Sequence, residues 1–146
     1  MFKTDVPLWL YIAVKEIGVA EIAGADSNPR INEYLKTVGM SPCDEIPWCA
    51  AFVNWTFKQA FMEGTNNAMA RSYLSWGIRC NPRIGAVVVF DRPGAAPGSG
   101  HVAFRLDESA GMVYVIGGNQ GNRVGIGRYP ANLVLGYYWP KEWPED

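Results

Sequence analysis

The sequence has few of the residues that support metal binding, polyanion binding or membrane insertion. Among its 146 residues there are one histidine and three cysteines, and no two cysteines have the CxxC spacing typical of zinc ligands. Lys and Arg number 13 against 14 Asp and Glu, which gives a formal net charge of -1 and predicts no basic surface for nucleic acid. No apolar run is long enough to span a bilayer. We therefore expect no metal, no cofactor, no nucleic-acid partner and no membrane insertion.

The N-terminal stretch "MFKTDVPLWLYIAVKEIG" lacks the features of a signal peptide. Its apolar run is short, Lys3 is offset by Asp5, and no small-residue cleavage pattern follows. We expect synthesis in the cytoplasm, so that any export would need another protein. The chain shows no internal repeat, low-complexity segment or linker, and residues 1–146 are expected to form a single, monomeric domain.

The first half of the sequence has the apolar spacing of helices. Apolar residues recur at three- and four-residue steps after Pro7, with Gly18 as the stop. A second helix is expected between Asn28 as its N-cap and Gly39 as its end. A third begins at Cys49 and is predicted to bury one apolar face, and a shorter helix is expected in "NAMARSYLSWG".

The second half has the composition of strands. Five short β-branched or aromatic runs, each bounded by turn-forming residues, follow one another: "AVVVF", "HVAFRL", "MVYVIGG", "RVGIGRY" and "LVLGYYW". Helices followed by strands indicate an α+β fold, in which the N-terminal helices pack on one face of a roughly five-stranded antiparallel sheet.

Cys49 occupies a position suited to a reactive thiol. In "DEIPWCAAFVNW" it begins the third predicted helix, where unsatisfied backbone N–H groups and the helix dipole stabilise a thiolate. Ala50 and Ala51 leave room beside the sulfur for a substrate carbonyl. The alternative is that Cys49 is a small core residue, which is the commoner role of a cysteine on an apolar helical face.

The single histidine, His101, begins a predicted strand after a loop rich in Gly and Pro. A neutral histidine is the usual base for activating a cysteine. If the next two strands form a hairpin, Asn119 returns beside His101, where its amide oxygen is predicted to accept the Nδ1 proton. The alternatives are a surface histidine and an asparagine that serves only its turn.

Six segments in order resemble the CHAP amidohydrolase/peptidase group of NlpC-type, papain-like cell-wall hydrolases, and most closely a compact subfamily of phage and prophage proteins. They are "NPRINEYL", "DEIPWCAAFVNW", "ARSYLSWG", "GHVAF", "GGNQGNRV" and "LGYYWP". The resemblance implies a papain-like fold and the cleavage of amide bonds in peptidoglycan. It also implies a cysteine nucleophile, a histidine base and a polar orienting residue, which fall on Cys49, His101 and Asn119.

Two positions depart from this group. Ala86 follows Gly85 where many relatives have an acidic residue, and Gly117 stands where the wider group often has a Glu. An acidic helper at position 117 is therefore missing. No DxDxDG-like run is present, so calcium dependence is not expected.

Further residues near the three motifs are candidates for substrate contact: Asp44, Glu45, Trp48, Arg71, Ser72, Gln120 and Asn122. For Asp44 and Glu45 the alternative role is to complement the helix dipole. Cys43 and Cys80 have no assigned chemistry, and whether they form a disulfide stays open.

Two other functions are compatible with the sequence. One is an acyltransferase on the same scaffold, and the other is a non-catalytic module that binds the cell wall or belongs to a virion. The hydrolase itself could be an endolysin released by a holin, a virion lysin or a secreted effector with an immunity protein. In each case we expect it to act in the periplasm or on the wall, on an amide bond that the sequence does not identify.

Overall fold

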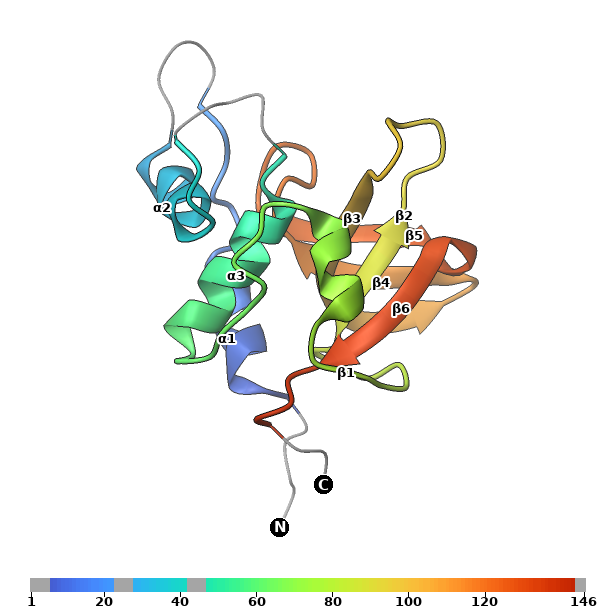
Figure 1. Cartoon of the computed structure of the whole chain (residues 1–146). Coiled ribbons are helices and arrows are strands. Elements are labelled where there is room, and N and C mark those ends of the chain that lie inside the picture. Colours follow the sequence, from blue (N-terminus) through green and yellow to red (C-terminus); the bar gives the residue numbers. More distant parts are fainter. Residues whose placement is uncertain (1–5, 23–27, 42–46, 144–146) are drawn as a thin grey trace.

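The computed structural model describes residues 6–22, 28–41 and 47–143. Helices α1 (Leu8–Lys15), α2 (Pro29–Thr37) and α3 (Cys49–Gln59) come first, followed by the short 3-10 helix η1 (Ala70–Ser75). The rest of the chain forms a sheet, with a second short 3-10 helix, η2 (Ala131–Leu133), before the last strand. Figure 1 shows the helices gathered to one side of the sheet, which is the α+β arrangement predicted from the sequence. Within the described residues no helix is long and apolar enough to cross a membrane.

The sheet is antiparallel and contains six strands in the order β1-β6-β2-β3-β4-β5. Its strands are β1 (Ile78–Arg79), β2 (Val87–Asp91), β3 (Gly100–Ser109), β4 (Met112–Gly117), β5 (Gly125–Pro130) and β6 (Val134–Trp139). Five of them cover the five predicted runs. The sixth, β1, has only two residues and pairs at the edge with the end of β6, and a strand that short leaves no periodic pattern in the sequence.

The predicted helix ends are confirmed at α2. The Asn28 side chain accepts a hydrogen bond from the backbone N–H of Arg30 at 2.8 Å, and Pro29 is the first helical residue. A cap of this kind contributes about 1 kcal/mol. Gly39, just beyond the helix, has φ +75°, a conformation that glycine adopts without strain. Gly18 has the same role after α1, with φ +102°.

Helix α3 is buried on nearly every side, whereas the sequence predicted a single buried face. All residues from Cys49 to Phe57 are buried, because α1 and α2 pack against α3 on one side and β3 packs on the other. Asn54, which the pattern placed outside the apolar face, is 2% exposed. Its amide donates to the carbonyl of Ala50 and accepts from the N–H of Asn66. This burial fixes the start of α3, where Cys49 lies.

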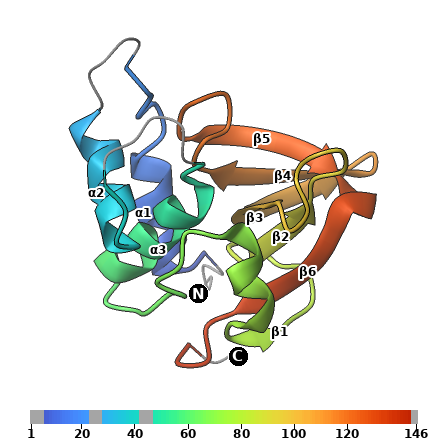
Figure 2. The ribbon, with the colours of Figure 1, turned by 45° about the horizontal axis from the view of Figure 1, so that its top comes forward.

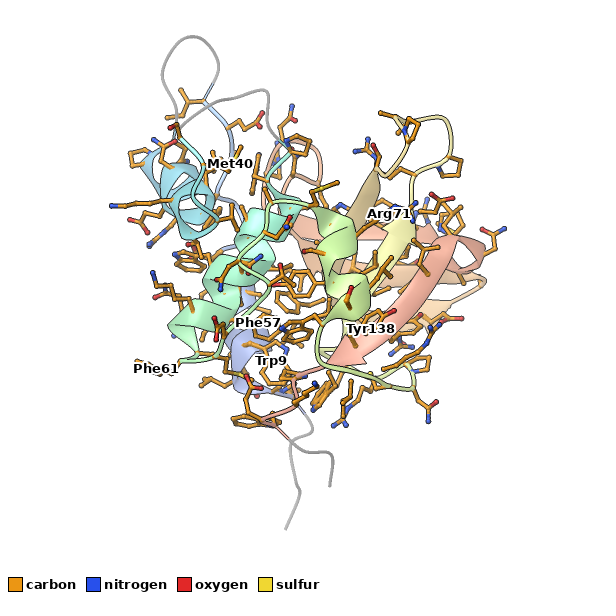
Figure 3. All side chains as sticks on the ribbon, in the orientation of Figure 1. Trp9, Met40, Phe57, Phe61, Arg71 and Tyr138 are labelled. Carbon is orange, nitrogen blue, oxygen red and sulfur yellow. The ribbon has the colours of Figure 1, made fainter. Side chains whose placement is uncertain are left out.

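Aromatic side chains fill the layer between the helices and the sheet. Trp9 of α1 and Phe57 of α3, both labelled in Figure 3, have ring centroids 5.6 Å apart. The ring of Phe104 of β3 lies 5.5 Å from that of Phe57. Burying each such side chain stabilises the fold by roughly 1.5–3 kcal/mol. A second, smaller cluster around Val88 and Phe90 covers the opposite face of the sheet. Strand β2 is therefore buried on both faces, near the middle of the curved sheet seen in Figure 2.

Candidate active site

Cys49 is the first residue of α3, as predicted, and is 5% exposed. The preceding Trp48 is buried, and its indole N–H donates to a carboxylate oxygen of Glu21 at 2.9 Å. Trp48 therefore anchors the turn into α3, while its own side chain offers no surface to a substrate. No side chain caps this helix end among the described residues, so its N–H groups face the region around Cys49.

His101 lies near the start of β3, directly opposite Phe90 of β2. Its ring stacks on Phe90 at a centroid distance of 6.3 Å and lies tilted against Tyr129 of β5 at 4.9 Å. The side chain is 8% exposed. Two aromatic neighbours from adjacent parts of the sheet thus hold the imidazole in one plane and limit its contact with water.

Cys49 and His101 form a hydrogen-bonded pair whose pKa values move in opposite directions. Burial raises the pKa of the Cys49 thiol, but the hydrogen bond and charge of His101, with backbone N–H groups of Val102 and Ala50, outweigh burial and lower it. Burial lowers the pKa of His101, but Cys49 and the hydrogen bond that the ring donates to Gln120 outweigh burial and raise it. Both shifts favour a thiolate and an imidazolium, which is the reactive form of such a pair.

Gln120 contacts the other side of the imidazole ring. Its Oε1 lies 2.9 Å from Nε2 of His101, and its Nε2 donates to the carbonyl of Gly125 at 2.7 Å. Because a carbonyl oxygen only accepts hydrogen bonds, the amide nitrogen must face Gly125 and the amide oxygen must face His101. The ring Nε2 therefore carries a proton in both charge states, and Nδ1 is left for Cys49.

Two glycines leave the space that the Gln120 side chain occupies. A Cβ atom on Gly117 of β4 would lie 2.8 Å from Oε1 of Gln120, and one on Gly127 of β5 would lie 2.9 Å from its Nε2. The space beside Gly117 is thus filled by the amide of Gln120, which reaches it from the following loop. That loop is held by hydrogen bonds between Val124 and Val19 and between Glu21 and Asn122.

The structure corrects the predicted partner of His101. Asn119 was expected to accept a hydrogen bond from the Nδ1–H group of the ring, whereas the observed hydrogen bond joins Gln120 to Nε2. Asn119 has φ +57°, a left-handed conformation, and it lines the same hollow as His101, with no hydrogen bond to the ring among the described contacts. The signal available in the sequence was Gly117, since a glycine beside the site makes room for a longer side chain.

Two hollows flank Cys49 and share Pro47, Cys49 and Arg92. The polar hollow, of about 300 Å³, is also lined by Phe90, Asp91, His101, Asn119, Asn122 and Tyr129. The apolar hollow, of about 290 Å³, is also lined by Ala68, Met69, Ala70, Pro97, Gly98, Ser99 and Gly100. Together they form a cleft with the sulfur near its middle, so a chain-like substrate can extend on both sides of the reacting atom.

Of the other residues predicted to contact substrate, Asn122 lines a hollow, whereas Arg71 and Ser72 do not. Asn122 lines the polar hollow. Arg71, labelled in Figure 3, has its donors engaged, to Asp91 at 2.7 Å and to the carbonyl of Ser99 at 2.8 Å. The Ser72 hydroxyl donates within η1 and contacts Thr65. Both residues brace the cleft and line neither hollow.

Three residues singled out in the sequence lie outside the described residues: Cys43, Asp44 and Glu45. Substrate contact by the two acidic residues, and a disulfide between Cys43 and Cys80, therefore stay predictions. Among the residues that are described, no three His, Cys, Asp or Glu side chains gather closely enough to hold a metal ion.

Comparisons with known proteins bear on the family and the fold. A sequence model of the CHAP domain matches residues 41–119, which include Cys49 and His101. A solved structure from Staphylococcus aureus subsp. aureus Mu50, described as similar to lipoprotein and of the NLP/P60 family, superposes with a TM-score of 0.57 and 16% identity. The match covers 96% of this chain and 43% of that one, so it shows the fold of one part of a longer protein. No curated protein gives a significant match.

Proposed function

The chain belongs to the CHAP domain family, a family of cysteine hydrolases that act on peptidoglycan, and from this premise we propose that it cleaves an amide bond of the cell wall. The family resemblance inferred from the six motifs is confirmed, whereas placement in a phage subfamily stays a prediction. The observation that carries the proposal is the pairing of Cys49 with His101, whose second ring nitrogen is held by Gln120.

The first step is attack on the substrate carbonyl. The Cys49 thiolate adds to the carbonyl carbon, and the negative charge moves to the carbonyl oxygen. The backbone N–H of Cys49, at the uncapped start of α3, is positioned to donate to that oxygen with the helix dipole behind it. The lowering of the Cys49 pKa favours the thiolate nucleophile before substrate binds.

The second step is departure of the amine. His101 transfers its Nδ1 proton to the leaving nitrogen, the C–N bond breaks, and a thioester to Cys49 remains. Water then adds to the thioester, with His101 accepting a proton, and the carboxylic acid product leaves with the thiolate restored. Gln120 accepts a hydrogen bond from the Nε2–H group throughout, so the ring keeps Nδ1 toward the sulfur in both steps.

The two hollows support a substrate that extends beyond the scissile bond. Met69 and Pro97 provide apolar contact on one side of Cys49, whereas Asn119 and Asn122 offer amide groups on the other. A peptide branch of peptidoglycan has both kinds of group.

Digestion of purified peptidoglycan sacculi tests the proposal. Wild type is expected to release soluble fragments whose masses identify the bond, while Cys49→Ala loses the nucleophile and falls by several orders of magnitude. Cys80→Ala is the matched control, because it removes a thiol that lines neither hollow. Thermal unfolding of the three proteins shows whether each is folded. Undiminished digestion by folded Cys49→Ala would contradict the mechanism.

A further inference from the structure

Arg92 is the one residue other than Pro47 and Cys49 that lines both described hollows. It follows directly after β2, whose last residue, Asp91, lies opposite Gly100 in the register that also pairs Phe90 with His101. Its side chain is exposed. Arg92 therefore borders both halves of the cleft with an exposed side chain, which a substrate in either half can reach.

The carboxylate of Asp91, next to Arg92 in the chain, already has hydrogen-bond partners. Oδ1 of Asp91 accepts from the Arg71 guanidinium at 2.7 Å and from the backbone N–H of Arg92 at 2.9 Å. Neither bond uses the side chain of Arg92. Across residues 6–22, 28–41 and 47–143 no acidic group forms an ion pair with it. The charges of Asp91 and Arg71 cancel, so the described cleft retains the positive charge of Arg92.

The charge of Arg92 reaches the reacting groups. Burial raises the pKa of Tyr129 and the charge of Cys49 adds to the rise, while the Arg92 guanidinium opposes it. At His101 burial lowers the pKa, Cys49 and Gln120 raise it, and Arg92 again works against protonation. An anion bound to Arg92 would remove that opposition and favour the imidazolium that protonates the leaving amine.

We propose that Arg92 binds a carboxylate of the substrate beside the scissile amide, which makes acidic peptides the preferred substrate class. The inference rests on the proposed function and deepens it. Carboxylate is the natural partner of a guanidinium, because two parallel N–H groups match its two oxygens. The bound carboxylate fixes which part of the peptide lies over Cys49 and neutralises the cleft at the moment of proton transfer.

The test compares soluble peptidoglycan fragments with the same fragments after their carboxyl groups have been converted to carboxamides by carbodiimide and ammonia. Wild type, Arg92→Gln, Arg92→Lys and Arg128→Gln are assayed on both. Arg128 is the matched control, because it is an exposed arginine next to Tyr129 on β5 and lines neither hollow. Initial rates give kcat and KM separately.

Wild type and Arg128→Gln are expected to lose about fivefold in kcat/KM on amidation, mainly through KM, as suits a solvent-accessible ion pair. Arg92→Gln should start about fivefold lower and show no response to amidation, with Arg92→Lys between the two. The preference of wild type should shrink as salt is added. Equal responses to amidation in wild type and Arg92→Gln would overturn this inference alone. No cleavage of either substrate by wild type would overturn the proposed function and the inference with it.

Discussion

Replacing Gln120 by Met tests whether Gln120 orients His101 through its hydrogen bond or merely lies beside it. Methionine keeps the length of the side chain between Gly117 and Gly127 but offers no acceptor to His101 and no donor to Gly125. The ring Nε2–H then loses its partner at 2.9 Å. Among the described residues, only the interaction with Cys49 itself would then favour the ring orientation that places Nδ1 toward the sulfur.

The size of the effect follows from the charge of the ring. A hydrogen bond to a charged partner contributes roughly 1.5–3 kcal/mol, which corresponds to a loss of about 10- to 150-fold in kcat/KM. The loss should appear mainly in kcat, because Gln120 contacts the base and lines neither hollow. Asn119→Gly is the control: it removes the neighbouring amide, tolerates φ +57° and should cost less.

Two measurements distinguish positioning from general stability. The first is kcat/KM on peptidoglycan for wild type, Gln120→Met and Asn119→Gly. The second is an NMR titration of the imidazole, whose signal is unambiguous because the chain has one histidine. Gln120 contributes to the raised pKa of His101, so Gln120→Met should lower that pKa in a variant that thermal unfolding shows to be folded.

The reasoning would be refuted by a folded Gln120→Met that keeps wild-type kcat and an unchanged His101 titration. A larger loss in Asn119→Gly than in Gln120→Met would also refute it, and would return the orienting role to Asn119. Gln120→Glu separates the two hydrogen bonds. It keeps an acceptor for the ring but cannot donate to Gly125, so we expect partial activity.

Two further predictions concern the same pair. Activity should follow a bell-shaped pH profile, because the ion pair forms as pH rises through the lowered Cys49 pKa and is lost above the raised His101 pKa. The acid limb of kcat/KM should therefore lie below 9.0, the ordinary pKa of a cysteine thiol. The alkaline limb should lie above 6.5, the ordinary pKa of histidine. A rate that begins to rise only above 9.0 would show that the thiol is not activated. Gly117→Ala should lower kcat although residue 117 lines neither described hollow, because the added Cβ would lie 2.8 Å from Oε1 of Gln120 and displace that side chain. Unchanged kcat in the folded variant would show that activity does not depend on the space beside Gly117.

Local chemistry made several features predictable. The N-cap at Asn28 and the start of α3 at Cys49 follow from residues within one turn of each helix end, since capping and apolar spacing are short-range effects. The placement of His101 at the beginning of β3 follows from the Gly-rich loop before it and the β-branched run after it.

Other features depend on contacts between distant segments. The burial of Asn54 on the supposedly polar side of α3 requires the loop at Asn66 to return over the helix. The pairing of β1 with β6 joins residues about 60 positions apart, with no pattern in the two-residue strand itself. Arg71 is engaged by Asp91 and Ser99 because η1 packs beside the end of β2, which no local spacing indicates.

The sequence by itself determined the α+β order, the N-cap of α2 at Asn28, the start of α3 at Cys49, and the choice of Cys49 and His101 as the two central residues of the site. Only the tertiary structure decided between Asn119 and Gln120. Adjacent residues in a turn point in different directions according to their backbone angles, and the space for a glutamine exists only because Gly117 and Gly127, on neighbouring strands, both lack a side chain. That space is a property of the assembled sheet, so it becomes visible only when the strands are placed side by side.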